Sequence, residues 1–81
     1  MLAARYTKIR RRTNQRRAYV LLVAPTLWGT LALVRQWGRI GVNRPHELAQ
    51  EFATEAEAKT AFRREARRRR ERGYRRERGA L

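Results

Sequence analysis

The apolar run at residues 18–24, Ala-Tyr-Val-Leu-Leu-Val-Ala, constrains the fold more than any other stretch of the chain. It is rich in β-branched and aromatic residues and has no polar residues at helical spacing, so it predicts a β-strand. Pro25 stops the run. A continuous apolar strand needs cover on at least one face. We therefore expect residues 17–24 to be the central and most buried strand of a sheet.

Three other segments have the alternation of β-strands. Residues 3–11 alternate loosely and predict a short edge strand, where basic side chains also discourage pairing with another copy. Residues 30–37 put Arg35 and Trp37 on the same side, because successive side chains of a strand point to opposite faces. Residues 47–53 form a fourth candidate strand. The sequence therefore predicts at least four strands before any helix.

The turn after the central strand contains one of the two tryptophans. Residues 25–29 read Pro-Thr-Leu-Trp-Gly, in which Pro25 presets φ and Gly29 tolerates conformations that other residues avoid. Trp28 at this turn can either cover the end of the sheet or stand exposed. We expect it to pack against the sheet.

A helix begins after the fourth strand. Thr54 and Glu57 have the spacing of a capping box, in which each side chain can satisfy a backbone amide of the other residue. Gly73 has the position of a terminating glycine, so we expect a helix at about residues 55–72. Its narrow apolar stripe, which we expect Phe62 to anchor to the sheet, consists of Ala58, Ala61, Phe62 and Ala66.

The charge of the chain indicates a polyanionic partner. The 81 residues leave room for one domain with a small core. The net charge is +14, and 19 of the 21 basic residues are arginine. Because a guanidinium group donates paired hydrogen bonds to phosphate, nucleic acid is the first candidate. Codon usage can also raise arginine content, but by itself it does not explain 21 basic against 7 acidic residues.

The residues of most catalytic and metal sites are absent. The sequence has no Cys, Ser or Asp, and its one histidine, His46, has no Cys, Asp or second His nearby and is interpreted as a surface or turn residue. We expect no enzyme activity, no catalytic residues, no metal and no cofactor. The apolar stretch at 18–34 is interrupted by Pro25 and Gly29 and is shorter than the ~20 residues of a spanning helix. We expect a cytoplasmic protein that does not bind membranes and could associate with the nucleoid.

Basic residues are concentrated in two segments. Residues 5–17 contain seven basic residues and no acidic one, and residues 63–78 contain ten arginines and three glutamates. Such runs can be solvated faces or disordered arms. We interpret them as two lobes of a phosphate-binding surface, although sequence does not show whether they lie on one face. The candidate phosphate contacts are Arg11, Arg12, Arg16, Arg67, Arg68 and Arg70.

A short motif supplies a candidate site for a base or sugar. Trp37, Gly38 and Arg39 follow the apolar residues 31–34. They combine a flat aromatic surface, a backbone position without a Cβ and a forked cation. Arg35, on the same side of the strand as Trp37, could form a cation–π pair or a nucleotide clamp. The alternative is that Trp37 is a core aromatic packed over open backbone.

The ordered set of residues resembles the WGR domain family. That family is best known as the module beside the catalytic region of DNA-dependent poly(ADP-ribose) polymerases, and it also occurs in short bacterial proteins. Besides the Trp-Gly-Arg motif with Ile40 and Gly41, the resemblance rests on Asn14, Tyr19, Phe52, Thr54, Ala58, Phe62, Arg69, Gly73 and Tyr74. It implies an α+β fold, in which one long C-terminal helix packs across a small antiparallel sheet of four or more strands. We expect a single domain over residues 1–81, with a core at about 3–74 and a basic C-terminal tail at 75–81.

Two functions from different classes follow. The first is a nucleic-acid-binding module, favouring DNA over RNA and acting at ends, breaks or single-stranded segments. The resemblance implies that Trp37 and Arg39 contact the DNA break or a neighbouring domain. The second is an adaptor that uses the same surface to grip an acidic protein partner. In either case we expect a monomer.

Overall fold

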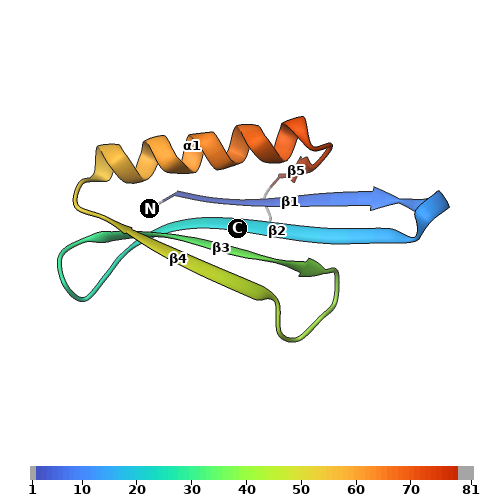
Figure 1. The fold of residues 1–81 in the computed structure, drawn as a ribbon, viewed down its shortest axis with the longest axis horizontal. Coiled ribbons are helices and arrows are strands. Elements are labelled where there is room, and N and C mark those ends of the chain that lie inside the picture. The colour runs from blue at the N-terminus through green and yellow to red at the C-terminus, as the bar shows by residue number, and fades with distance from the viewer. Residues whose placement is uncertain (1, 79–81) are drawn as a thin grey trace.

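The computed structural model describes residues 2–78. In chain order the elements are β1 (Leu2–Arg10), the short 3-10 helix η1 (Arg11–Thr13), β2 (Gln15–Pro25), β3 (Leu31–Arg39), β4 (His46–Phe52), α1 (Glu55–Glu71) and β5 (Arg75–Glu77). The strands form one antiparallel sheet in the order β4-β3-β2-β1-β5, and α1 lies across one face of it (Figure 1). This arrangement confirms the predicted α+β class.

The core lies between α1 and the face of the sheet that the helix covers. Along β2, buried Tyr19, Leu21 and Val23 alternate with half-buried residues that point to the other face. The strand order places β2 in the middle of the sheet, as the apolar run predicts. The remaining buried apolar residues of this core are Ala4, Tyr6, Leu33, Ala58 and Ala66.

Two predicted boundaries are wrong in a way that matters for the site. β3 continues to Arg39 instead of ending at residue 37, so Gly38 and Arg39 belong to a strand that pairs with Ala18 and Arg17. β4 begins at His46, directly opposite Trp37. The sequence pattern missed the last two residues of β3 because glycine and arginine do not favour strands. Pairing with β2 keeps these two residues in the sheet.

The residues after the helix also differ from the expected basic tail. Arg75–Glu77 form β5, which pairs with β1 through partners Arg5, Tyr6 and Thr7. The Arg5 guanidinium and the Glu77 carboxylate form an ion pair 2.5 Å apart at this edge. A strand of three residues with two arginines has no apolar alternation, so its sequence gives no strand signal. The rest of the expected tail, residues 79–81, lies outside the described residues.

The ends of α1 lie where the caps predict, but one of the two capping-box amide bonds is replaced, because the Glu57 carboxylate accepts from the Thr54 hydroxyl and not from the Thr54 amide. The Glu57 amide donates to the Thr54 hydroxyl at 3.2 Å, and that hydroxyl donates to the Glu57 carboxylate at 2.9 Å. Gly73 has φ +86, the left-handed conformation that ends many helices. The Tyr74 amide then donates to the carbonyl of Arg69 at 3.0 Å. The chain therefore turns back toward the sheet at Tyr74, as predicted.

The buried face of α1 is less apolar than predicted. Ala58 and Ala66 are buried and Phe62 packs half-buried against the core, but Glu65 and Arg69 are buried on the same face. All five follow the three- and four-residue spacing of one helix face. The sequence analysis did not include these two charged residues in the buried stripe, because charged side chains are seldom buried unless paired.

Trp28 does not pack on the sheet, so that expectation is wrong. It is 81% exposed at the β2–β3 turn, and its neighbour Leu27 is 96% exposed. The turn is held by the Thr26 hydroxyl, which accepts hydrogen bonds from the amides of Trp28 and Thr30. Within the described residues, no helix has the length and apolar character needed to cross a membrane.

Candidate nucleic-acid interface

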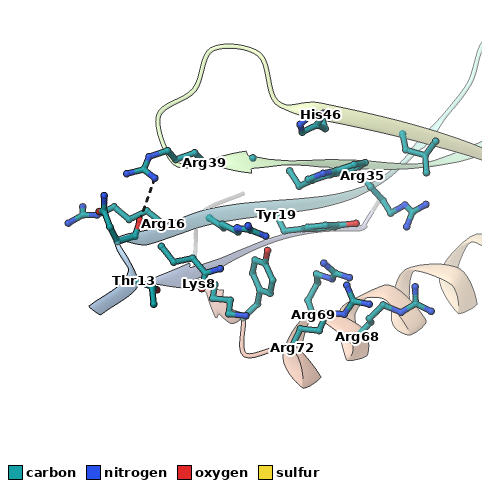
Figure 2. A pocket seen from close by; sticks show the side chains of 17 residues that line it. Lys8, Thr13, Arg16, Tyr19, Arg35, Arg39, His46, Arg68, Arg69 and Arg72 are labelled. Atoms are coloured by element: carbon teal, nitrogen blue, oxygen red, sulfur yellow. Dashed lines mark hydrogen bonds between the residues drawn. The ribbon is translucent and has the colours of Figure 1, made fainter. Parts of the chain in front are cut away.

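A large hollow lies on the helix side of the sheet, where the C-terminal part of α1 faces the start of β2 and the end of β3 (Figure 2). Its volume is about 1140 Å³. That exceeds the ~300–1,000 Å³ of ordinary small-molecule sites. We call it the basic basin, and it is lined by Lys8, Thr13, Asn14, Gln15, Arg16, Arg17, Tyr19, Arg35, Trp37, Gly38, Arg39, His46, Leu48, Arg68, Arg69, Arg72 and Tyr74.

Three aromatic rings on adjacent strands form the floor of the basic basin. Tyr19, Trp37 and His46 are direct cross-strand partners on β2, β3 and β4. The rings of Tyr19 and Trp37 have centroids 5.7 Å apart and planes 13° from parallel. Those of Trp37 and His46 are also 5.7 Å apart, with planes at 25°. Because β2 and β4 flank β3 on opposite sides, one ring lies against each face of the Trp37 indole.

Arg69 of α1 extends this arrangement from the helix. Its guanidinium carbon lies 4.2 Å from the centroid of Tyr19 and 5.5 Å from that of Tyr74. Figure 2 shows Tyr19 between His46 and Arg69. We call the series Arg69, Tyr19, Trp37 and His46 the aromatic stack. A guanidinium over an aromatic face is attracted by the electron density of the ring, so the stack holds a cation at its helix end.

Arg69 is only 7% exposed, and within residues 2–78 the structure gives it no ion pair. Its Nε also has no hydrogen-bond partner among these residues. Burying a cation without a counter-ion is unfavourable unless something compensates for the lost hydration. The rings of Tyr19 and Tyr74 provide part of that compensation, and an anion in the basic basin would provide more.

Arg35 has a different environment from the one expected. Its Nη1 lies 3.3 Å from the Glu65 carboxylate, which also lies 3.6 Å from Nη1 of Arg68. The cations that stack on rings within residues 2–78 are Lys8 and Arg69, so the predicted cation–π pair between Arg35 and Trp37 does not form. Arg35 instead ties β3 to α1, and Glu65 neutralises part of its charge.

The basic segments at the two ends of the sequence converge on the basic basin. Lys8, Arg16 and Arg17 come from β1 and β2, whereas Arg68, Arg69 and Arg72 come from the end of α1. With Arg35 and Arg39, eight cationic side chains line it, and no carboxylate is among the lining residues. Cations gathered around a concave site focus the electrostatic potential there. The basin is therefore a strongly positive site with an aromatic floor.

Gly38 and Arg39 shape the rim of the basin. A Cβ added to Gly38 would lie 3.2 Å from Cγ2 of Val42 and 3.7 Å from Cα of Pro45, so the glycine lets the β3–β4 loop pack against β3. That packing places His46, the next residue, beside Trp37. Arg39 is exposed, and its Nη1 donates to the carbonyl of Asn14 at 3.4 Å (Figure 2).

Six of the ten residues proposed from sequence line the basic basin, namely Arg16, Arg35, Trp37, Gly38, Arg39 and Arg68. The other four, Arg11, Arg12, Arg67 and Arg70, are exposed outside it. Sequence reasoning did not place Lys8, Tyr19, His46, Arg69, Arg72 and Tyr74 in the site. The strand register is what brings Tyr19 and His46 to Trp37. A fourth strand that begins one residue earlier than predicted includes His46, but its pairing with Trp37 depends on the register between β3 and β4.

Within residues 2–78 there is no cluster of three His, Cys, Asp or Glu side chains that could hold a metal ion. The groups that line the basic basin bind by charge, hydrogen bonds and ring contacts.

Comparison with known proteins gives the family of the chain. The model of the WGR domain matches residues 3–80. The uncharacterized protein y4dW of Sinorhizobium fredii strain NBRC 101917 / NGR234 is 37% identical over 61 residues, which are 75% of this chain and 29% of that protein. The chain thus matches less than a third of the length of this relative. No solved structure is a significant match. The chain belongs to the WGR domain family, a family of binding modules.

Proposed function

We propose that the protein binds nucleic acid, with DNA favoured over RNA, in the basic basin. The observation that carries the proposal is the convergence of eight cationic side chains and no carboxylate on one concave site. A polyanion that binds there would release counter-ions from its phosphates, which is the main source of affinity in most nucleic-acid complexes. Membership of the WGR domain family supports nucleic acid as the ligand.

The aromatic floor supports a role at DNA ends, breaks or single-stranded segments. A continuous duplex presents phosphates and groove edges, while its base faces are covered by neighbouring bases. Exposed or half-buried rings such as those of His46 and Trp37 add little to binding of that surface but can contact exposed sugars and bases. Trp37 would contribute through the edge of its indole, and Arg39 through its exposed guanidinium at the rim.

The alternative is an adaptor that grips an acidic protein surface in the same site. The cations would attract both nucleic acid and an acidic protein. Only the nucleic-acid function predicts an affinity that depends both on salt and on whether the nucleic acid is single-stranded, nicked or duplex. Fluorescence anisotropy with blunt duplex, nicked duplex, single-stranded DNA and structured RNA, each at several salt concentrations, separates the two. If six phosphates are neutralised, the slope of log K against log salt should be about −5. The absence of binding to all four, or an affinity that does not change with salt, would contradict the proposal.

A further inference from the structure

Trp37 is the residue that the sequence favours for stacking, but its position restricts that role. Tyr19 and His46 lie parallel to its indole, one on each side, with centroids 5.7 Å away. A base cannot stack on a ring face that already has a neighbour unless that neighbour moves. The open face of the aromatic stack must therefore lie at one of its two ends.

The two ends of the aromatic stack differ. At the helix end, Arg69 covers Tyr19 at 4.2 Å and is buried. At the other end, His46 is exposed on β4, which is one of the two edge strands of the sheet in the described part of the chain. One face of its imidazole meets Trp37, and the other points away from β3. His46 is therefore the member of the stack with an open ring face.

The position of the imidazole is supported from behind. Pro45 precedes His46 and packs over Gly38, which has no Cβ to block the approach. Pairing with Trp37 in the sheet register fixes His46 from the side. A ring held by backbone packing and by a neighbouring ring loses little additional freedom when a ligand stacks on it. His46 thus has the features of a preorganised platform rather than of a loose surface residue.

The geometry points to His46 as the stacking platform for one unpaired base of a nucleic acid bound in the basic basin. This inference rests on the proposed nucleic-acid function and names the feature of the ligand that the site recognises. The imidazole ring offers the area of one base and not of a base pair. In the interior of a duplex both faces of each base are covered, and at a blunt end the open face belongs to a base held in its pair, so an unpaired base or an overhang fits this platform better.

The charges around His46 favour a base attached to phosphates over an aromatic side chain of a protein. Arg35 and Arg39 line the same basin, and Arg44 precedes His46 by two residues. Cations on the flanks of a stacking ring hold the backbone of a single strand while the base contacts the ring. Since every base has a π face, the platform selects for single-stranded character and not for a particular sequence.

Two variants at position 46 and one control test the inference. His46→Ala removes the ring, and His46→Phe keeps a ring of similar size without its nitrogens. Trp28→Ala removes an exposed ring at the opposite end of the molecule. Each protein is titrated by fluorescence anisotropy with single-stranded DNA of about 12 nucleotides, within the usual site sizes, and with a blunt duplex. Circular dichroism confirms that the variants are folded.

We expect His46→Ala to weaken single-strand binding by about 5- to 100-fold, the loss of one stacked base. Duplex binding should change less than about twofold, because phosphate contacts remain. His46→Phe should restore most of the single-strand affinity, and Trp28→Ala should leave both affinities unchanged. A His46→Ala protein that binds single strands as the unmodified protein does would overturn the inference, as would a His46→Phe protein as weak as His46→Ala.

These outcomes are distinct from failure of the proposed function. If the unmodified protein binds neither the single strand nor the duplex, both the function and the platform are wrong. If it binds both with steep salt dependence and His46→Ala has no effect, the basic basin binds nucleic acid but His46 does not stack. If the imidazole instead contacts an aromatic side chain of a protein partner, His46→Ala will likewise leave nucleic-acid binding unchanged.

Discussion

The two tryptophans of the chain are each followed by glycine, yet they occupy opposite environments. Trp28 and Gly29 lie at the tip of the β2–β3 turn, where the indole is 81% exposed. Trp37 and Gly38 lie within β3, where the indole is flanked by two rings. The β2–β3 turn and the start of α1 lie at one end of the molecule, and η1 and the end of α1 lie at the other (Figure 1).

The two ends also differ in charge. The Thr30 hydroxyl donates to the Glu51 carboxylate at 3.2 Å beside the β2–β3 turn, and Glu55 and Glu57 begin the helix nearby. The last turn of the same helix carries Arg68, Arg69 and Arg70. Anions at a helix N-terminus and cations at its C-terminus both interact favourably with the helix dipole. The helix therefore places its acidic residues at one end of the molecule and its basic residues at the other. The basic end is suited to a polyanion.

Cross-strand neighbours decide the role of an aromatic residue more than the residues beside it in sequence. Trp37 has Tyr19 and His46 opposite it in the register. Trp28 lies outside the strands, and its indole has no ring partner among the described residues. If the ring neighbours of Trp37 govern stability and binding, substitutions at the two ends of the molecule should have different effects.

The largest effect should come from removing Trp37, with removal of Trp28 as the control. Trp37→Ala takes away a ring that contacts Tyr19, His46 and the core, and should lower the free energy of unfolding by about 3 kcal/mol, near the low end for large aromatics in cores. Trp28→Ala should change it by less than about 0.5 kcal/mol, as exposed substitutions usually do. Urea denaturation measures both. Equal effects of the two substitutions would refute the contrast.

A somewhat smaller loss is expected for Phe62→Ala. Phe62 is half-buried against the core from α1, so we expect a loss of about 2 to 3 kcal/mol, below the range for fully buried phenylalanine. The matched control is Leu27→Ala, which removes a large apolar side chain that is 96% exposed. An unchanged thermal midpoint for Phe62→Ala would mean that the helix packs through another face.

The third prediction compares cations inside and outside the basic basin. A double Arg16→Gln and Arg72→Gln variant removes one lining cation from each basic segment, and Arg67→Gln with Arg70→Gln removes two exposed cations outside it. Both variants lower the net charge equally. The first should weaken DNA binding by about tenfold and make the salt slope shallower by about 2, whereas the second should change the slope by less than about 1. Identical slopes for the two variants would show that total charge, and not the basin, binds DNA.

The smallest effect concerns the acidic end of the molecule. Lys59, which hydrogen-bonds to Glu55 at 2.7 Å and attracts its charge, lowers the pKa of that carboxyl below its ordinary value of 4.5. A lowered folded-state pKa adds stability that is present above about pH 4.5 and is lost as pH falls through the folded pKa. Glu55→Gln should therefore lower the thermal midpoint slightly at pH 7 and not at pH 3. A difference that persists at pH 3 would require another cause.

Much of the fold follows from local sequence rules. The apolar run at 18–24 predicted the central strand, and the capping residues Thr54, Glu57 and Gly73 predicted both ends of α1. Each of these signals acts between residues close in sequence or within one element. The strand at Arg75–Glu77 was missed because its pairing with β1 depends on contacts about 70 residues apart.

The candidate site was harder to predict because its parts come together only through the register and the helix orientation. The Trp-Gly-Arg motif lies at the end of β3 that lines the basic basin, and the excess of arginine indicated a polyanionic ligand. No local pattern places Arg69 over Tyr19, or His46 against Trp37. The burial of Glu65 between Arg35 and Arg68 is likewise set by packing of α1 on the sheet.

Tryptophan fluorescence tests the central claim, that nucleic acid binds at the Trp37 end and not at the Trp28 end. The chain has two tryptophans, so Trp28→Phe leaves Trp37 as the only reporter and Trp37→Phe leaves Trp28. Each variant is titrated with single-stranded DNA at low salt, with anisotropy of labelled DNA as the measure of binding. We predict that binding changes the intensity or emission maximum of Trp37 and leaves the emission of Trp28 unchanged. Binding that alters Trp28, or that leaves Trp37 unaltered, would contradict the account.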